Sequence, residues 1–238
     1  MKKTIFPILF LLLLLSFSSC KKVTHSDVSV NIAFNIGNET VDWDTLLYAN
    51  AAGNQFSVNH LQFFISDLKL TDAGGNVFSW DIYQYVDYDD PSTFNFSLSD
   101  VPVGTYTSFT ANIGLNATQN VDDGLPNVQE LNAMAWPVPM GGGYHFMKME
   151  GYYLDSAANP IGYAMHLGRS ENLAFSTGTM SIEFEEETEG MTLTFDIMEW
   201  HQNPTNWDFN TDGTAIMADP TAQTKLSNNG ATVLSVSK

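Results

Sequence analysis

Cysteine and basic residues are scarce in this 238-residue chain. It has 1 Cys, and 9 Lys and Arg stand against 27 Asp and Glu, which gives a formal net charge of −18. A single cysteine excludes an internal disulfide framework and any site built from several thiolates. The shortage of cations excludes a general nucleic-acid-binding protein, because phosphates are bound by clustered Lys and Arg. At 44% hydrophobic and 13% aromatic residues, the chain is too apolar to be an acidic disordered protein, and its length suits one globular domain.

The first 19 residues indicate a lipoprotein signal peptide. Lys2 and Lys3 form a basic start, residues 5–15 form an apolar stretch too short to span a bilayer well, and small residues precede Cys20. We expect a lipid on Cys20, residues 20–27 as a tether, and a mature protein held in the bacterial cell envelope, in the periplasm or exposed at the surface. The alternative is an ordinary signal peptide with an incidental cysteine. Removal of residues 1–19 takes away two lysines and no acidic residue, so the net charge falls from −18 to about −20.

Short segments of alternating apolar and polar residues dominate the rest of the chain. The first, residues 28–36, places every second side chain from Val28 to Ile36 on one apolar face, as in a half-buried strand. Turn residues bound each segment at spacings typical of sandwiches and barrels. We therefore predict an all-β fold, an antiparallel β-sandwich-like single domain over residues 28–238. The expected strands are residues 28–36, 56–70, 77–86, 94–98, 105–115, 144–154, 161–167, 180–184 and 191–197.

Two segments depart from this pattern. Residues 221–229, which end in Asn-Asn-Gly, predict a short C-terminal helix. Residues 116–143 have many turn residues, little alternation and three consecutive glycines, and they predict a long irregular loop. Loops of this length inside a compact domain often carry function.

The sequence has no motif of a common catalytic machinery. Nucleophile-elbow, HExxH, phosphate-loop and dinucleotide-binding patterns are all missing. The chain after Cys20 has no thiol nucleophile, and acidic pairs such as Asp122-Asp123 carry little information in so acidic a protein. We therefore expect a binding protein and not an enzyme.

Histidines are the candidate metal ligands. Neutral imidazole binds copper or zinc well, and a Met thioether adds affinity for cuprous ion. His145 shares a strand face with Met147 and Met149 in one predicted strand, and His166 lies in the next. If residues 155–160 form the connecting loop, Met149 falls opposite His166, and His145 sits roughly 13 Å away along the hairpin. The two imidazoles then share an ion only if a bulge or a different loop length brings them closer; otherwise they are residues of a polar cleft.

The other histidines are weaker candidates. His60, at the start of a predicted strand, is a possible further ligand. His201 is expected in an exposed turn, and His25 in solvent.

Residues 208–219 resemble a calcium loop. Asp208, Asn210, Asp212 and Asp219 fall at positions one, three, five and twelve, with glycine at six, as an EF-hand loop requires. Position twelve is not the usual Glu, and a preceding proline prevents a helix from leading into the loop. Calcium at these four residues is the alternative to copper, and an Asx-rich turn before the final helix is the metal-free interpretation.

Six segments occur in the order typical of one known family. They are residues 59–70 (NHLQFFISDLKL), 101–106 (VPVGTY), 112–114 (NIG), 134–136 (MAW), 143–151 (GYHFMKMEG) and 166–168 (HLG). Together they resemble the methanobactin-associated copper-binding proteins, the MbnP-like family, over roughly residues 28–236.

The resemblance implies a β-rich, secreted or lipid-anchored copper-binding protein of the cell envelope. It also implies that Trp136, His145 and His166 match residues of the copper site. The best-known members are modified by a dihaem, peroxidase-like partner that oxidises a tryptophan to kynurenine, and this residue joins two histidines at copper. In the known kynurenine site a histidine follows the tryptophan by two residues, where this chain has Val138. Trp136 is therefore either a modified or third ligand or a core aromatic residue.

These observations predict a lipid-anchored protein that functions by copper binding, uptake or storage. The ligands would be His145 and His166, with Trp136 or His60 as a third. Imidazole nitrogens more than about 8 Å apart could not share an ion whose bonds are about 2 Å long. The alternative is a metal-free or calcium-stabilised surface lipoprotein that acts as an interaction module.

Overall fold

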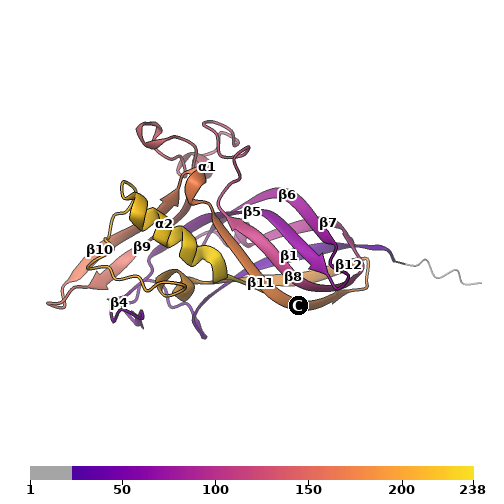
Figure 1. Cartoon of the computed structure of the whole chain (residues 1–238), viewed down its shortest axis with the longest axis horizontal. Helices are drawn as coiled ribbons and strands as arrows, with labels where there is room; N and C mark the ends of the chain where they lie inside the picture. The colour runs from indigo at the N-terminus through magenta and orange to yellow at the C-terminus, as the bar shows by residue number, and fades with distance from the viewer. Residues whose placement is uncertain (1–22) are drawn as a thin grey trace, which may run out of the picture.

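The computed structural model describes residues 23–238, so the expected signal peptide and Cys20 lie outside the described residues. Two curled sheets face each other (Figure 1). The strands are β1 (His25–Ile36), β2 (Glu39–Thr40), β3 (Tyr48–Ala49), β4 (Gln55–Phe56), β5 (His60–Asp72), β6 (Val77–Asp87), β7 (Asn95–Pro102), β8 (Gly104–Ile113), β9 (His145–Leu154), β10 (Pro160–Gly168), β11 (Ala174–Phe184), β12 (Thr188–Asp196) and β13 (Leu234–Ser237).

Helices are short. The α-helices are α1 (Gln129–Asn132) and α2 (Pro220–Asn229), and single 3-10 turns are η1 (Pro91–Phe94), η2 (Val138–Met140), η3 (Ser170–Asn172), η4 (Ile197–His201) and η5 (Gly230–Thr232). The predicted C-terminal helix is confirmed as α2, which Asp219 begins by accepting hydrogen bonds from the backbone N–H of Thr221 and Ala222. Within residues 23–238, no helix combines the length and the apolar composition that a membrane span requires.

The smaller sheet has the order β13-β12-β1-β2, with β7 also paired to β1, and the larger has the order β11-β8-β5-β9-β4-β3, with β6 on β5 and β10 on β9. The all-β prediction is therefore confirmed, and most pairs are antiparallel as expected. One pair differs: β1 and β12 run parallel from Asp27↔Thr188 to Asn35↔Asp196. This is possible because β12 follows β11 of the larger sheet and crosses to the smaller one. β1 also begins at His25, so residues 25–27, which we expected in the tether, belong to the sheet.

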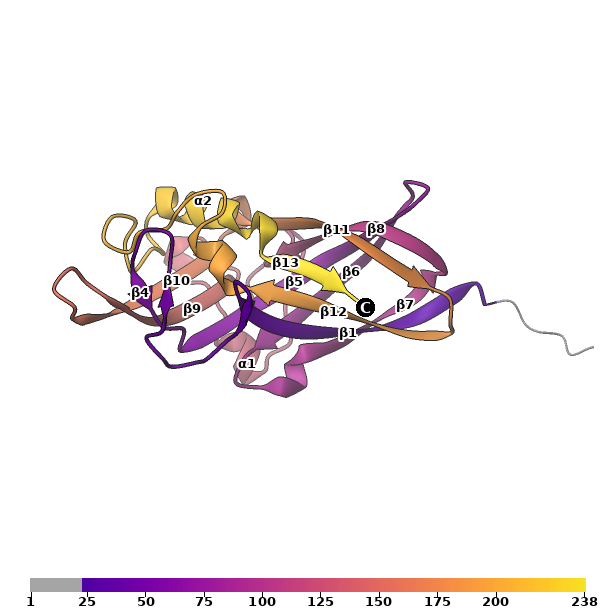
Figure 2. The same cartoon turned by 90° about the horizontal axis from the view of Figure 1, so that it is seen from below.

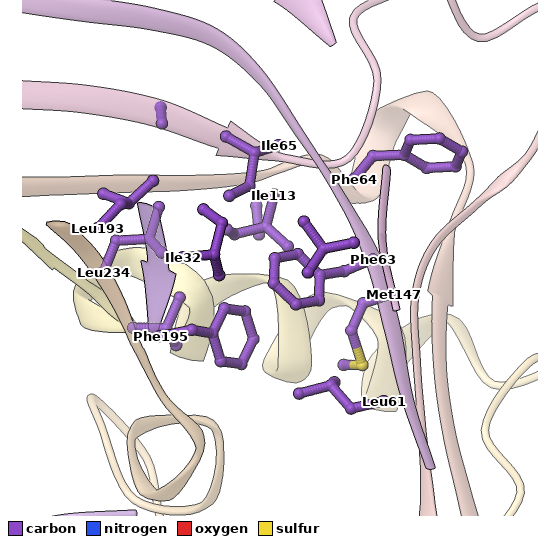
Figure 3. Packing of buried hydrophobic residues seen from close by; sticks show 14 of the residues in the cluster. Ile32, Leu61, Phe63, Phe64, Ile65, Ile113, Met147, Leu193, Phe195 and Leu234 are labelled. Carbon is purple, nitrogen blue, oxygen red and sulfur yellow. The ribbon is translucent and has the colours of Figure 1, made fainter. Parts of the chain in front are cut away.

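The core lies between the two sheets. β1 shows why the strands form: its buried pattern alternates strictly from Ser26 to Ile32, so one face is apolar and the other faces solvent. Phe63 of β5 stacks on Phe195 of β12, with ring centroids 4.4 Å apart. Burial of each such side chain stabilises the fold by about 1.5–3 kcal/mol. Figure 3 shows this packing, in which Ile32, Phe63, Ile65, Ile113, Leu193 and Phe195 fill the space between the sheets.

The hairpin β9–β10 extends beyond the sandwich at one end of the molecule (Figures 1 and 2). Helix α2 packs on β10 and β11. Residues 116–143, the predicted irregular loop, contain only α1 and η2 and return the chain to the start of β9. Histidines 145 and 166 lie in this hairpin, so its register decides whether they meet.

Candidate metal site

The pairing of β9 with β10 brings His145 and His166 together. The hairpin pairs Leu154 with Pro160, one residue earlier than expected, so that Lys148 and not Met149 stands opposite His166. A bulge then places His145 opposite Gly168, two residues beyond His166. The ring centroids of the two histidines are 5.1 Å apart, and the rings are nearly perpendicular at 86°. The separation of roughly 13 Å derived from a simple register is therefore wrong.

The bulge also changes which side chains share a face with His145. One extra residue in a strand reverses the alternation, so Met147 and Met149 point into the core, where both are fully buried. The expectation that these thioethers lie on the His145 face is wrong for this reason. The face that carries His145 and His166 instead carries Lys148 and Glu150.

His145 is held by the chain that leads into β9. Its ring Nδ1 lies 3.0 Å from the carbonyl oxygen of Met134. A carbonyl only accepts, so Nδ1 carries the proton and Nε2 keeps its lone pair. The pKa of His145 is lowered from 6.5 to about 4, chiefly by burial and to a smaller extent by nearby positive charge, including that of Lys148. His145 is therefore a neutral imidazole at neutral pH, the form that binds metal.

His166 is held by Glu150. The imidazole Nε2 lies 2.6 Å from Glu150 Oε1. This hydrogen bond is the main cause that lowers the pKa of Glu150, so the carboxylate is ionised and Nε2 carries the proton. The other nitrogen, Nδ1, is buried and has no hydrogen-bond partner within the described residues. A buried lone pair without a partner is costly unless something binds it.

Trp136 lies against His145. The centroids of the indole and the imidazole are 4.7 Å apart, and the indole is only 1% exposed. Its position follows from two backbone hydrogen bonds: Trp136 N–H donates to the Gly143 carbonyl (2.8 Å), and His145 N–H donates to the Met134 carbonyl (2.6 Å). Residues 134–136 thus run beside residues 143–145 as a short bridge.

Gly168 makes room for Trp136. A Cβ atom at Gly168 would lie 2.4 Å from Cε3 of the indole, closer than real contacts allow. The glycine of the His-x-Gly segment is therefore explained by close packing against the tryptophan. Trp136 is at once a core aromatic residue and a neighbour of the histidine pair.

Side chains from distant segments fix both strands at the open end of the hairpin. Asn120 Oδ1 accepts from Tyr144 N–H (2.8 Å), and Asp122 Oδ1 accepts from Gly143 N–H (2.6 Å), which anchors the irregular loop beside the site. On the other side, Gln223 of α2 accepts from Gly168 N–H and donates to the carbonyl of His166. Gln223 is buried, so α2 holds the end of β10 that carries His166.

The polar face of the hairpin continues into a surface hollow of about 620 Å³. His60, Lys148 and Glu150 line it, and His60 pairs with Glu150 across the ladder between β5 and β9. His60 is 27% exposed, and its Nδ1 is 3.9 Å from Asp89 Oδ2. His60 therefore lies beyond Glu150, on the side away from the histidine pair, and is not part of that pair.

The donor set fits a metal ion that accepts two imidazoles. Two nitrogens on one ion with bonds of about 2 Å lie at most about 4 Å apart, and rings with centroids 5.1 Å apart can present nitrogens at such a separation. Each ring also donates its other N–H to a fixed acceptor, the arrangement usual for metal-bound histidine. Among residues 23–238, no three His, Cys, Asp or Glu side chains converge on one point. The site would therefore consist of the pair alone, or of the pair with a ligand of another kind, such as Trp136.

The calcium-loop residues have other contacts. Asp212 Oδ2 accepts from Lys225 Nζ (2.7 Å) and from Asp208 N–H (2.7 Å). Asp208 Oδ1 accepts from Asn210 N–H, and Asp219 begins helix α2. The segment has the geometry of an Asx-rich turn before a helix, and its carboxylates bind cations and N–H groups of the chain itself.

His201 differs from expectation. It lies in η4 and is completely buried, with its ring 4.3 Å from that of Phe56. The flanking polar residues indicated an exposed turn, but the chain on both sides is anchored by buried Trp200 and Trp207. Burial lowers the pKa of His201 to about 3, so it is a neutral core residue.

Sequence reasoning did not identify Glu150, Lys148 and Gln223 as residues of the site. Alternation along β9 does put Lys148 and Glu150 on one face. Alternation alone does not connect these two residues with His145, because the bulge is what places His145 on their face. Gln223 gives no local signal, since its role depends on how α2 packs.

Comparisons with known proteins concern the family and the fold of the whole chain. The sequence model of the MbnP family matches residues 25–218. The chain is also similar to the solved structure of MbnP from Methylosinus trichosporium, with a TM-score of 0.57, 13% sequence identity, and coverage of 90% of this chain and 99% of that one. The comparison with curated proteins finds no match. At so low an identity the structural likeness shows the fold, and the family match over most of the chain shows that it belongs to the MbnP family.

Proposed function

We propose that this protein binds copper in the cell envelope, and that His145 and His166 are the ligands. The observation that carries the proposal is the buried Nδ1 of His166, which has no hydrogen-bond partner among residues 23–238 while Glu150 fixes the opposite nitrogen. Imidazole is a good copper ligand, and a carboxylate on the far nitrogen orients the ring and increases its basicity. Membership of the MbnP family supports copper as the ion.

Binding, and not catalysis, is the proposed role. His145 is neutral at neutral pH because of its lowered pKa, so it can bind a metal ion without first losing a proton. Trp136 packs against His145 from the loop and is nearly fully buried. A bound ion would therefore be shielded from water, which suits uptake or storage.

The proposal includes a lipid anchor at Cys20 and residence in the envelope. Its support is the basic and apolar leader that ends in Cys20. The test is expression in a bacterial host with and without Cys20→Ala. Wild type should fractionate with membranes, and the variant should appear in the soluble fraction.

Trp136 is the proposed place for the oxidative modification that the family resemblance implies, and a dihaem peroxidase-like protein is the proposed partner. The support is the contact between Trp136 and His145, which puts the indole at the edge of the histidine pair. Intact-mass measurement of protein from its native envelope tests this directly. An unmodified mass would leave copper to the two histidines alone.

The copper proposal is tested by chelator competition on the mature domain. Cu(I) and Cu(II) should each be offered at one equivalent, and we expect tight binding of at least one of them. His145→Ala and His166→Ala should each weaken binding severely, whereas His25→Ala, which changes an exposed histidine, should not. Affinity no better than micromolar, or equal affinity in the double variant, would contradict the proposal.

A further inference from the structure

Lys148 is an unusual cation in this protein. Four of the 9 Lys and Arg lie in residues 1–22, which leaves five in the described part of the chain. Arg169, Lys225 and Lys238 each make an ion pair with a carboxylate. Lys148 makes none within the described residues, although it is partly buried and the chain is strongly acidic. Its ammonium group donates one long hydrogen bond, 3.4 Å, to Gln62 Oε1.

Lys148 stands directly beside the histidine pair. It is the cross-strand partner of His166, and directly opposed residues on one face have Cβ atoms about 4.5–5.5 Å apart. Its positive charge also acts on His145 and on Glu150, lowering the pKa of each. The ammonium donates to Gln62 on β5, on the side of β9 opposite β10, so it acts on the pair through its charge and not by contact.

The charges around the pair nearly cancel. Both imidazoles are neutral ligands, Glu150 contributes one negative charge and Lys148 one positive charge. Without Lys148, Glu150 would attract a divalent ion twice as strongly as a monovalent one, and the positive charge of Lys148 cancels this attraction. The cost of removing the ion from water grows with the square of its charge, because this solvation energy follows the Born relation. A divalent ion is thus penalised more than a monovalent one at this site.

We propose that Lys148 is a specificity-determining residue that favours a monovalent metal ion over divalent ions at the His145–His166 pair. The inference rests on the proposed function, and it adds which ionic charge the site prefers. Cuprous ion is the monovalent ion that imidazole binds well, and Zn²⁺ is the divalent competitor that the same ligands accept. Lys148 does not touch the metal; it acts through its charge.

Lys148→Met is the decisive variant, because it keeps the length and the apolar stem of the side chain and removes the charge. Cu(I) and Zn²⁺ affinities are measured separately by chelator competition, and their ratio is compared with wild type. We expect the preference for Cu(I) to fall by about tenfold or more, chiefly through tighter Zn²⁺ binding. Lys148→Arg, which restores the charge, should keep the wild-type ratio.

Lys69→Met is the matched control. Lys69 is an exposed lysine of β5 without an ion pair in residues 23–238, and it is seven residues from Gln62, or about 23 Å along the strand. The ratio should not change in this variant. If Lys148→Met does not fold, Lys148→Gln replaces it. A competition experiment on the wild-type protein tests the inference without any variant. Excess Zn²⁺ should fail to displace bound Cu(I).

The outcomes separate the two proposals. Wild type that binds neither form of copper would overturn the proposed function together with this inference. Copper binding by wild type with an unchanged ratio in Lys148→Met, or with an equal change in Lys69→Met, would overturn this inference alone. Displacement of Cu(I) from the wild-type protein by a low concentration of Zn²⁺ would also overturn this inference alone.

Discussion

His145 and His166 lie with ring centroids 5.1 Å apart because their strands are paired out of simple register. Two local features combine to produce this result. A tight turn at residues 155–159 shifts the pairing by one residue, and a bulge at Phe146 advances His145 by one more and changes its face. Neither feature alone brings both rings to the same side of the hairpin. The pair is thus a product of backbone irregularity in an otherwise regular ladder.

Glu150 should tune copper binding through His166. Replacement of Glu150 by Gln removes the negative charge that holds the Nε2 proton, and replacement by Ala removes the acceptor altogether. Loss of such a partner typically weakens metal binding 10–100-fold, so we expect about tenfold for Gln and more for Ala. Copper affinity by chelator competition measures the effect. Glu171→Gln, an exposed carboxylate paired with Arg169, is the control and should bind as wild type does.

Equal affinities in the Glu150→Gln and Glu150→Ala variants and in wild type would show that Glu150 does not support the metal ligand. Circular dichroism on each variant excludes misfolding as the cause of any loss. We expect copper affinity to decrease in the order wild type, Glu150→Gln, Glu150→Ala.

Gly168 should be intolerant of any side chain. In Gly168→Ala the added Cβ would meet the indole of Trp136 at 2.4 Å, and the indole is fully packed and cannot move away. Overpacking of this kind costs about 1–3 kcal/mol. Gly162→Ala in the same strand is the control, since its Cβ would have its nearest contact at 3.9 Å. Urea unfolding should show a clear loss of stability for Gly168→Ala and none for Gly162→Ala; similar curves would disprove the packing argument.

The strands could be predicted because each buries one face. Alternation with period two is set by backbone geometry, so residues 28–36, 77–86 and 191–197 were recognised to within a few residues. The parallel pairing of β1 with β12 could not be predicted, because alternation does not state which strand is the neighbour. The short C-terminal helix could be predicted from its Asn-Asn-Gly stop.

The site could be predicted only as a set of residues. His145 and His166 stood out by chemistry, but their separation depended on a bulge, and a run such as His145-Phe146-Met147, buried at all three positions, fits either register. His201 was misjudged because its polar neighbours suggested a turn, whereas tertiary packing of two tryptophans carries it inside. Alternation does not state where a bulge falls in a buried run, and local preference does not state which segments tertiary packing buries.

Calcium should not stabilise the protein. In the segment that resembles a calcium loop, Asp212 already binds the ammonium group of Lys225 at 2.7 Å, and Asp219 caps α2. We expect the same melting temperature in millimolar calcium and in EDTA. Asp212→Asn should lower stability by about 1 kcal/mol or less through loss of the ion pair, equally in both buffers. A melting temperature that rises with calcium in wild type but not in Asp208→Ala would establish the calcium site instead.

His201 should make the protein sensitive to acid. The ring is completely buried against Phe56, and neither nitrogen has a partner within residues 23–238. Its folded-state pKa is about 3 against an ordinary value of 6.5, because burial disfavours the charged form. As the pH falls below 6.5 the unfolded chain takes up the proton and the folded chain does not. The free energy of unfolding therefore decreases from pH 6.5 down to about pH 3, by about 1.4 kcal/mol for each pH unit.

His201→Phe isolates this contribution. Phenylalanine keeps an aromatic ring between Phe56 and Phe209 and removes both buried nitrogens and the titration. Denaturant unfolding of wild type and variant at pH 7.5 and pH 4.5 gives the comparison. We expect the variant to gain roughly 2–3 kcal/mol relative to wild type on going to the lower pH, as two pH units below 6.5 require. Other groups that titrate in this range, His145 among them, are common to both proteins and cancel in the difference. Parallel pH profiles would mean that His201 is protonated in the folded state as readily as in the unfolded chain, which its complete burial contradicts.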